Sequence, residues 1–281
     1  MKSIHDALRE ACNQAGVVYK EVPADGRFHP ADIADDPHGK GDGRIKLFPD
    51  GEGGLVANWK TGDDPIPFFI DDGRKLTDSE RRERDRRRDE AIRSTRAEEK
   101  KRRAEAAEQA AATWAVATPA GADHPYLTKK RVKPYGVRVH DGRLIVPVKI
   151  DGVISSLQYI ANDGGKLFHR GGAKGRGFHL IGEARADGVI CIAEGYATAA
   201  SIHEATGYPV AVAFDAGNLE PAAVSLRKAY PTATLIVCGD DDHVTPGNPG
   251  RTKAMAAAKS AGGVAVFPEF GADRPAKASD F

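Results

Sequence analysis

Acidic residues follow two short apolar runs in the C-terminal part of the chain. Glu194 comes directly after the run VICIA, and Asp240, Asp241 and Asp242 come after the run TLIVC and a single glycine. Short, continuous, β-branched runs are typical of strands that are buried on both faces of a parallel sheet. Because ligands bind at the carboxyl ends of such strands, these acids are candidates for one shared site. Carboxylate oxygens are the ligands that Mg²⁺ or Mn²⁺ requires, so the pattern predicts a divalent-metal site.

The three consecutive aspartates also have a simpler interpretation as a turn that caps a helix, since Asp commonly serves both purposes. Two observations favour a site instead: Glu194 ends a second strand, and Asp215 follows a third apolar run, VAVAF. Acids at neighbouring strand ends repel one another unless a cation lies among them. Because side chains alternate along an extended chain, Asp240 and Asp242 can point into the same site.

The elements that must position these acids follow from the alternation of apolar and helical stretches over residues 183–281. The apolar runs predict four strands, at 189–193, 210–214, 234–238 and 264–267. Helices are expected between them, near 196–206, 219–230 and 250–261. Asn218 and Asn248 are placed to begin helices, and Gly207 and Gly262 to end them. The pattern predicts an α/β domain in which a parallel sheet carries helices on both faces.

Residues 113–182 are expected to form a basic α+β subdomain. Two alternating apolar stretches flank an Asp-Gly turn at 151–152, which predicts an antiparallel hairpin. Further along, glycines are interleaved with Arg170, Lys174 and Arg176. The backbone there can approach a ligand closely while the cations supply charge, which suits an anionic ligand.

The charge of the chain is strongly segregated. Residues 129–176 contain 11 basic and 3 acidic side chains, a net charge of +8, whereas residues 177–281 contain 8 and 12, a net charge of −4. A basic block of this density suits a polyanion such as nucleic acid, and it is also typical of a solvated surface. Both interpretations stay open from charge alone.

Residues 1–76 are expected to form a small β-rich module with a hairpin around the glycines of RIKLFPDGEGGLVANWK. Trp59, Phe68 and Phe69 could stack on nucleobases, although in a module this small aromatic residues are more typical of the core. Residues 77–112 lack Gly and Pro and are rich in Glu and Arg, which predicts an exposed, charged helical linker. The module could bind template, bind a partner or serve as a structural cap.

The overall composition is that of a folded, soluble protein, with 41 basic and 40 acidic residues and 41% hydrophobic residues among 281. Membrane helices need about 18–20 consecutive apolar residues, and no stretch approaches that length. The N-terminus also lacks the apolar core of a signal peptide, so we expect a cytoplasmic protein with no membrane partner. The three cysteines are far apart and form no paired CxxC, so neither zinc nor a disulfide framework is expected.

Together these motifs resemble the Toprim domain, which is shared by bacterial DnaG-type primases, topoisomerases and some nucleases. The similarity is greatest to primases of plasmids and phages, and it is carried by Glu194-Gly195, the stretch FDAGNL from Phe214 to Leu219, Asp240 to Asp242, and Asn248-Pro249-Gly250. Upstream, HPYLTKKRV, GRLIVPV and GGKLF resemble the basic N-terminal subdomain of a primase catalytic core. The resemblance therefore covers approximately residues 118–281.

The resemblance implies a DNA primase core that makes short RNA primers on single-stranded DNA, for plasmid or phage replication or transfer. It implies that Glu194, Asp240 and Asp242 are catalytic and that these residues, with Asp241, hold Mg²⁺ or Mn²⁺. The implied partners are single-stranded DNA, nucleoside triphosphates and a helicase or other replication protein. The candidate nucleic-acid and nucleotide contacts, each of which could equally be an ordinary surface residue, are Lys129, Lys130, Arg131, Lys166, Arg170, Lys174, Arg176, Asn218, Arg251 and Lys253.

The sequence also departs from the DnaG-type pattern. Those primases begin with a zinc ribbon, which this sequence lacks, and no helicase motor is present. Related primases continue past an acidic position comparable to Asp280, so we expect this sequence to be part of a longer protein. Two alternatives stay open: a Toprim nuclease, which would use water as the nucleophile at the same metal site, and a non-catalytic nucleic-acid-binding replication module. A topoisomerase is disfavoured because its tyrosine-bearing domains need a much longer chain.

Overall fold

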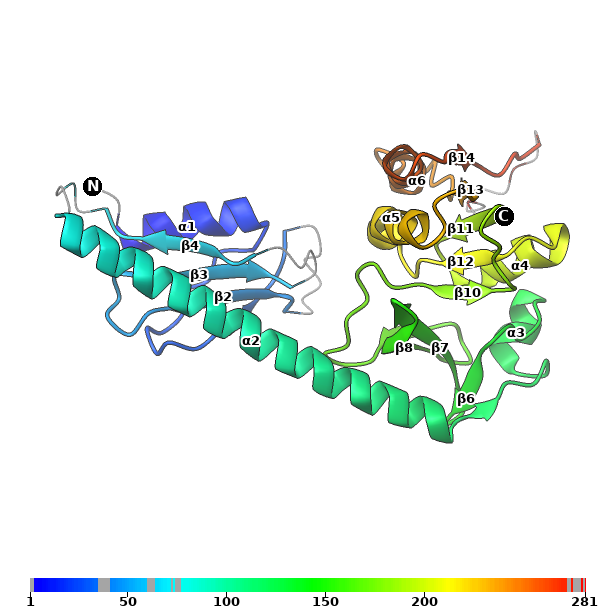
Figure 1. Cartoon of the computed structure of the whole chain (residues 1–281), viewed down its shortest axis with the longest axis horizontal. Helices are drawn as coiled ribbons and strands as arrows, with labels where there is room; N and C mark the ends of the chain where they lie inside the picture. The colour runs from blue at the N-terminus through cyan, green and yellow to red at the C-terminus, as the bar shows by residue number, and fades with distance from the viewer. Residues whose placement is uncertain are drawn as a thin grey trace. The chain divides into compact units, whose positions relative to one another are not determined.

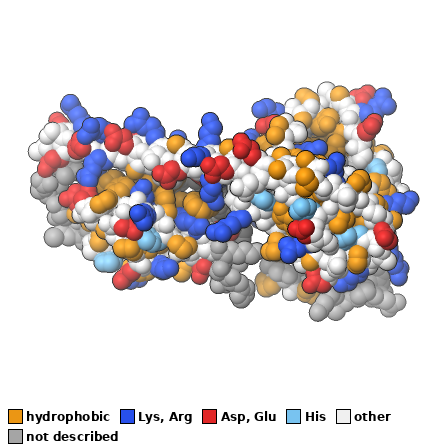
Figure 2. Space-filling view, turned by 90° about the horizontal axis from the view of Figure 1, so that it is seen from below, with side chains coloured by type: hydrophobic (Ala, Val, Ile, Leu, Met, Phe, Trp, Pro, Cys, Tyr) orange, Lys and Arg blue, Asp and Glu red, His pale blue; other side chains and the backbone are white. Residues whose placement is uncertain are grey.

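The structure is a computed structural model that describes residues 3–34, 41–59, 64–71, 73, 77–271, 274, 279 and 281. It contains two compact units, Met1–Glu99 and Lys100–Phe281 (Figure 1). Among the described residues, no helix combines the length and the apolar character that crossing a membrane requires. On the face drawn in Figure 2, basic and acidic side chains are interspersed.

The first unit is built on a four-stranded antiparallel sheet in the order β1-β2-β3-β4. Its strands are β1 (His29–Ala31), β2 (Gly43–Leu47), β3 (Gly53–Asn58) and β4 (Ile66–Phe69), and β2 and β3 form the hairpin that the sequence predicts. Helix α1 (Ile4–Ala15) begins at a capping box formed by Ser3 and Asp6 and ends at Gly16 in the left-handed conformation. Its apolar face packs against the sheet, as the core that it shares with Ile45, Val56 and Phe68 shows.

The aromatic residues of this unit divide between core and surface. Phe68 is 6% exposed and belongs to the core. Trp59 is half-buried, and the guanidinium of Arg44 lies 3.8 Å from its ring centroid. The core interpretation is therefore confirmed for Phe68, whereas Trp59 forms a cation–π pair.

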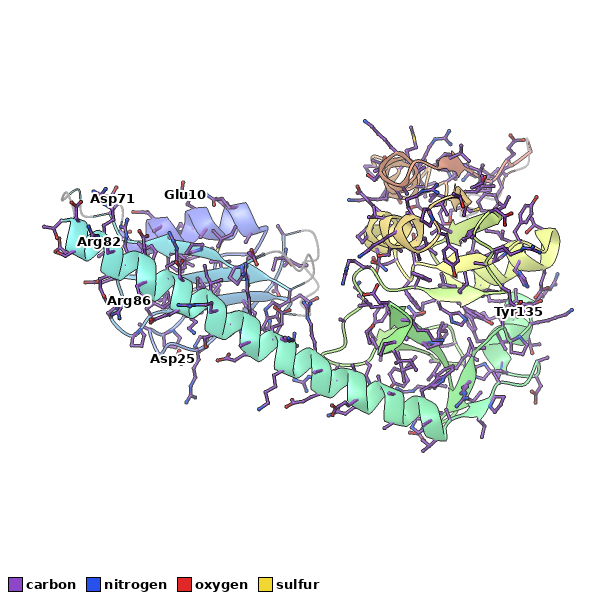
Figure 3. The ribbon with its side chains drawn as sticks, in the orientation of Figure 1. Glu10, Asp25, Asp71, Arg82, Arg86 and Tyr135 are labelled. Carbon is purple, nitrogen blue, oxygen red and sulfur yellow. The ribbon has the colours of Figure 1, made fainter. Side chains whose placement is uncertain are left out.

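Helix α2 (Asp78–Val116) is the long charged helix, and the division between the two units falls within it. Thr77 and Glu80 form a reciprocal cap at its start. Ion pairs three residues apart, such as Arg86 with Glu83, then support the exposed part, where Arg82 and Arg86 project from the helix (Figure 3). The helix continues past the predicted end at Ala112 because Ala110 and Trp114 pack against the following sheet.

The second unit contains two sheets. The first is antiparallel, in the order β5-β6-β7-β8-β9, with α3 (Pro125–Lys130) after its first strand. Its strands are β5 (Thr118–Pro119), β6 (Arg138–His140), β7 (Arg143–Ile150), β8 (Val153–Ile160) and β9 (Lys166–Phe168). Asp151 and Gly152 both have positive φ, as the tight hairpin turn between β7 and β8 requires.

The second sheet has the order β10-β12-β11-β13-β14. Its strands are β10 (His179–Ile181), β11 (Val189–Ala193), β12 (Val210–Val212), β13 (Thr234–Cys238) and β14 (Val264–Val266). The last four strands pair in parallel, and α4 (Tyr196–Thr206), α5 (Leu219–Ala229) and α6 (Pro249–Ala261) connect them, so the predicted parallel sheet with flanking helices is confirmed. Strand β10 differs: it lies within the range 113–182, yet it pairs antiparallel with β12.

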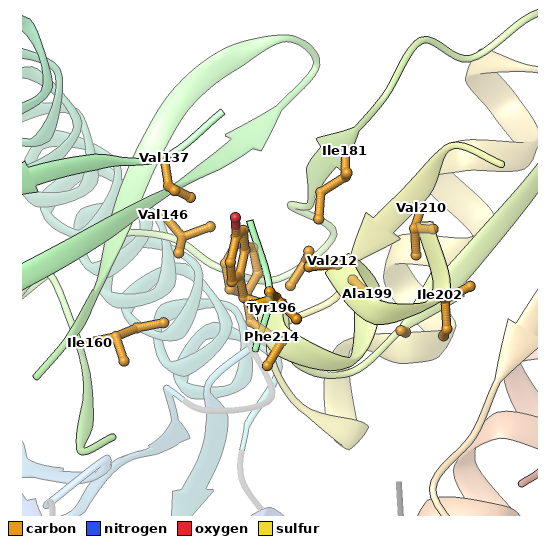
Figure 4. Close-up of a cluster of buried hydrophobic side chains, with 14 of the residues drawn as sticks. Val137, Val146, Ile160, Ile181, Tyr196, Ala199, Ile202, Val210, Val212 and Phe214 are labelled. Atoms are coloured by element: carbon orange, nitrogen blue, oxygen red, sulfur yellow. The ribbon is translucent and has the colours of Figure 1, made fainter. Parts of the chain in front are cut away.

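The two sheets of this unit share one hydrophobic core. Side chains of β7 and β8, such as Val146 and Ile160, pack in it together with Tyr196 of α4 and Val212 of β12 (Figure 4). Polar contacts reinforce the junction, because the Tyr196 hydroxyl donates to Lys133 O at 3.1 Å and accepts from Tyr135 N at 2.7 Å. This shared core fixes the basic sheet against the sheet that carries the acids.

Candidate active site

Glu194 and the three aspartates follow the carboxyl ends of two neighbouring strands, the central strand β11 and its neighbour β13. Ala193, the last residue of β11, lies opposite Cys238, the last residue of β13, so Glu194 leaves the sheet beside Gly239 and Asp240. A Cβ at Gly239 would lie 2.4 Å from Cβ of Ala254 on α6, so only glycine fits at the start of this loop. The local sequence thereby brings α6 close to the loop that carries the aspartates.

Glu194 lies in an environment that opposes its ionisation. Burial and then the negative charges of Asp240, Asp215 and Asp242 raise the pKa of Glu194 to about 7, while the charge of Lys166 acts in the opposite direction. The charges of Asp240 and Asp242 act on Glu194 from the end of the neighbouring strand, and the shared metal site predicted for the three acids stays a prediction. Asp215, which is absent from the predicted catalytic set, joins the same cluster, and its position directly after an apolar run was the signal for it.

Asp215 is held in place by its neighbours. Phe214 adopts a φ of +75°, an unusual conformation for a bulky residue, and its ring packs edge-on against Phe168 of β9, with centroids 5.9 Å apart. The carboxylate of Asp215 accepts a hydrogen bond from Asn218 N at 3.1 Å and one from Lys174 Nζ at 2.5 Å. A lysine of the glycine-rich loop is thereby fixed beside the acidic cluster.

Asp242 caps helix α6. Its Oδ2 accepts a hydrogen bond from Gly250 N at 3.0 Å, at the end of the helix where the dipole favours an anion. A Cβ at Gly250 would lie 2.6 Å from Asp240 O and 2.8 Å from Asp242 Oδ2, so this glycine permits the close approach of helix and loop. Asn248 begins the helix, as predicted, with its side chain accepting from Arg251 N.

Asp241 has different partners from Asp240 and Asp242. Its carboxylate accepts hydrogen bonds from Asn248 Nδ2 at 2.7 Å and from Arg274 Nη1 at 2.6 Å. The bonds to Asn248 and Arg274 lower the pKa of Asp241, so the carboxyl stays ionised. Both oxygens of the Asp241 carboxylate are therefore engaged, and its role as a metal ligand stays a prediction.

Two of the predicted cations adjoin the acids. Lys166 Nζ lies 3.6 Å from the position that a Cβ on Gly195 would occupy, and its charge acts on Glu194. Lys174 contacts Asp215 and lies over the Phe168 ring. A third, Arg251, lies 3.9 Å from Asp241 and stacks on Phe267. The other predicted cations are exposed on the surface of the same unit: Lys129, Lys130, Arg131, Arg170, Arg176 and Lys253.

Asn218 has a structural role. It is 4% exposed, and its Nδ2 donates to Gly177 O and Ala213 O at 2.9 and 2.8 Å. Its Oδ1 accepts from Arg176 N at 2.8 Å. The side-chain amide is thus engaged at both ends and holds the glycine-rich loop against the second sheet, and the predicted nucleotide contact of Asn218 stays a prediction.

The acidic cluster suits a hard cation. Its carboxylate oxygens are the donors that Mg²⁺ prefers, and a cation would relieve the repulsion that perturbs Glu194. Within the described ranges, no three His, Cys, Asp or Glu side chains converge closely enough to form a complete metal site. Mg²⁺ usually takes only one or two carboxylates and completes its shell with water and substrate phosphate, so the donors present fit this ion. Asp280 lies outside the described residues.

Comparison with known proteins defines the class of this domain. Residues 188–268 match the Toprim domain family, so this segment of the chain is a Toprim domain. Two proteins of Escherichia coli, both named DNA primase TraC, resemble the chain: one is 39% identical over 194 residues, or 63% of this chain, and the other is 33% identical over 258 residues, or 88%. The resemblance to Toprim-type DNA primases that the motifs indicate is confirmed.

The chain spans 18% of the length of each of these relatives. A solved structure of the bacteriophage T7 lagging-strand DNA polymerase interacting with primase domains also matches, at 17% identity over 51% of this chain and 79% of that chain, with a TM-score of 0.35.

Proposed function

We propose that this chain contains a DNA primase core that makes short RNA primers on single-stranded DNA by metal-dependent nucleotidyl transfer, for plasmid or phage replication or transfer. The observation that carries the proposal is the cluster around Glu194, in which three further carboxylates and Lys166 act on one half-buried acid at the end of β11. The similarity of the chain to two DNA primases supports the choice of nucleotidyl transfer as the reaction.

Each residue of the cluster has a separate task in this reaction. Asp240 and Asp242 would hold one or two divalent cations, which supply positive charge to the phosphates undergoing transfer. Glu194 accepts the proton of the primer 3′-hydroxyl while the 3′-oxygen bonds to the α-phosphorus and pyrophosphate leaves. A cation held by Asp240 and Asp242 would relieve the repulsion that raises the pKa of Glu194, so the side chain would be ionised and able to accept this proton.

The substrates would be bound from the basic sheet. Lys166 and Lys174 lie beside the acids, where they can neutralise a triphosphate, and Asp215 orients Lys174 for this contact. The exposed cations at the end of α3 and in the glycine-rich loop would contact the phosphates of the template. A helicase or another replication protein would be the further partner.

The proposal is tested by incubating the chain with single-stranded DNA, labelled ribonucleotides and Mg²⁺ or Mn²⁺ and sizing the products on a denaturing gel. We expect short new oligomers that disappear in Glu194→Gln. The matched control is Glu183→Gln, which neutralises an exposed glutamate of the same unit and should retain synthesis. Degraded template would indicate a nuclease, and DNA binding with neither product would indicate a binding module.

A further inference from the structure

Arg274 and Ser279, which follow β14 in the chain, contact the loop that carries the three aspartates. Figure 1 shows the C-terminal end of the chain lying beside the second sheet, and Asp241 N donates a hydrogen bond to Ser279 O at 2.7 Å. The guanidinium of Arg274 makes two further bonds, from Nη1 to Asp241 Oδ2 and from Nη2 to Asp241 O, both at 2.6 Å. One residue of the loop is therefore bound through its amide, carbonyl and carboxylate.

The partners of Asp241 are themselves held. The Arg274 guanidinium stacks on the Phe270 ring, 4.0 Å from its centroid, and its side chain is 20% exposed. Asn248 donates to Asp241 Oδ1 at 2.7 Å while it begins helix α6. Asp241 is thus tied on one side to the start of α6 and on the other to the segment after β14.

These contacts bear on the metal-binding acids because Asp240 and Asp242 are the chain neighbours of Asp241. Asp240 and Asp242 repel Glu194, and this repulsion would drive a loosely held loop away from the cluster. The positive charge of Arg274, bound to Asp241, offsets part of that repulsion. It also holds the backbone of the loop in one conformation, so metal binding loses less conformational entropy.

We propose that Arg274 is a positioning residue, which uses Asp241 as an anchor to hold Asp240 and Asp242 toward Glu194 in readiness for a divalent cation. The inference rests on the proposed function of this site. It assigns Asp241 to the support of the site and not to the metal, and it gives the segment after β14 a part in catalysis.

The inference and the alternative, in which Asp241 is itself a ligand, predict opposite effects for one substitution. If Asp241 is an anchor, removal of the guanidinium frees the loop and metal affinity falls. If Asp241 is a ligand, removal of its competing partner frees a carboxylate and metal affinity rises.

The test is a titration of the whole chain with Mn²⁺, in which electron paramagnetic resonance measures the free ion. It compares wild type with Arg274→Ala and Arg274→Lys. Loss of a residue that orients metal ligands typically weakens binding about 10-fold or more, and we expect this for Arg274→Ala, with partial recovery in Arg274→Lys. The control is Arg185→Ala, which removes an exposed arginine of the same unit and should bind Mn²⁺ as wild type does. Thermal unfolding of each variant verifies that it is folded.

Steady-state primer synthesis provides a second readout. A positioning role predicts that Arg274→Ala needs about 10-fold more Mg²⁺ for half-maximal rate while its rate at saturating Mg²⁺ stays close to wild type. Unchanged or tighter Mn²⁺ binding by Arg274→Ala would overturn the inference and leave the proposed function standing. Failure of the wild-type chain to bind Mn²⁺ would overturn both.

Discussion

The loops that follow β12 and β13 use similar parts for different purposes. After β12, the Asp215 carboxylate accepts hydrogen bonds from the backbone N–H of Asn218 and from Lys174 Nζ. The fixed carboxylate therefore orients the flexible lysine of the glycine-rich loop. After β13, Asp241 is held by Asn248 and Arg274, so a fixed cation orients a run of anions. Under the proposed function, the loop after β12 would serve the substrate phosphates and the loop after β13 the metal, so substitutions in the two loops should impair synthesis in different ways.

The largest effect should come from the metal side of this comparison. Replacing both Asp240 and Asp242 by Asn removes two anionic ligands, and we expect primer synthesis to fall about 1,000-fold or more at any Mg²⁺ concentration. Asp187→Asn, an exposed acid of the same unit, serves as the control in the same gel assay. Persistence of synthesis in the double variant would contradict the catalytic assignment.

The next largest effect is a pH-dependent loss of stability where the two sheets of the second unit meet, at His179 and Tyr135. Burial lowers the pKa of His179, on β10, to about 4. Its Nε2 lies 2.9 Å from the backbone oxygen of Tyr135, a residue that Figure 3 labels. Because an unfolded histidine titrates near 6.5, the unfolded chain binds more protons between pH ~6.5 and ~4, so stability falls as the pH falls through this window, by up to about 3 kcal/mol. We expect urea unfolding of wild type to show this loss, and His179→Gln to show a smaller dependence. Parallel curves for the two proteins would exclude His179 as the cause.

A matched pair of glycines compares the two loops directly. A Cβ at Gly250 would lie 2.6 Å from Asp240 O, whereas a Cβ at Gly217 would lie 3.2 Å from Asp215 Oδ1. Gly250→Ala must displace the loop after β13, and we expect Mn²⁺ binding to weaken about 10-fold, with little change for Gly217→Ala. Equal affinities in the two variants would show that the close approach of α6 is unimportant.

The smallest effect should come from the phosphate side. The ion pair of Asp215 with Lys174 is partly exposed, and such pairs contribute at most about 1 kcal/mol, or roughly fivefold. We expect Asp215→Asn to raise KM for nucleoside triphosphates by about that factor and to change kcat less, because the pair orients a binding group. A fall in kcat at unchanged KM would place Asp215 with the metal ligands instead.

Local patterns account for the parts of the structure that the sequence predicts. The hairpin around Asp151 and Gly152 follows from turn chemistry, and the positions of Glu194 and Asp240 follow from the apolar runs that precede them. These features depend on neighbours in the chain, so a single sequence carries the information.

The features that the sequence did not predict depend on contacts between distant segments. Strand β10 pairs with β12, which lies beyond β11 and α4 in the chain, and its own residues give no sign of which sheet it joins. Arg274 contacts Asp241 across 33 residues, and Lys174 contacts Asp215 across 41. Residue type alone does not reveal the partners of Asp241 and Asn218, because those partners lie far away in the chain or depend on how the loops fold.

The pairing of β10 with β12 has a consequence for any attempt to isolate the Toprim domain. A fragment that begins at residue 183 would leave β12 as a bare edge strand, with its hydrogen-bonding groups and the apolar side chains of Val210 and Val212 newly exposed. Such an edge promotes aggregation, and the fragment would also lose the side chains of β7 and β8 that complete its core. Residues 100–281 should therefore be expressed as one piece, and they should melt in a single cooperative transition.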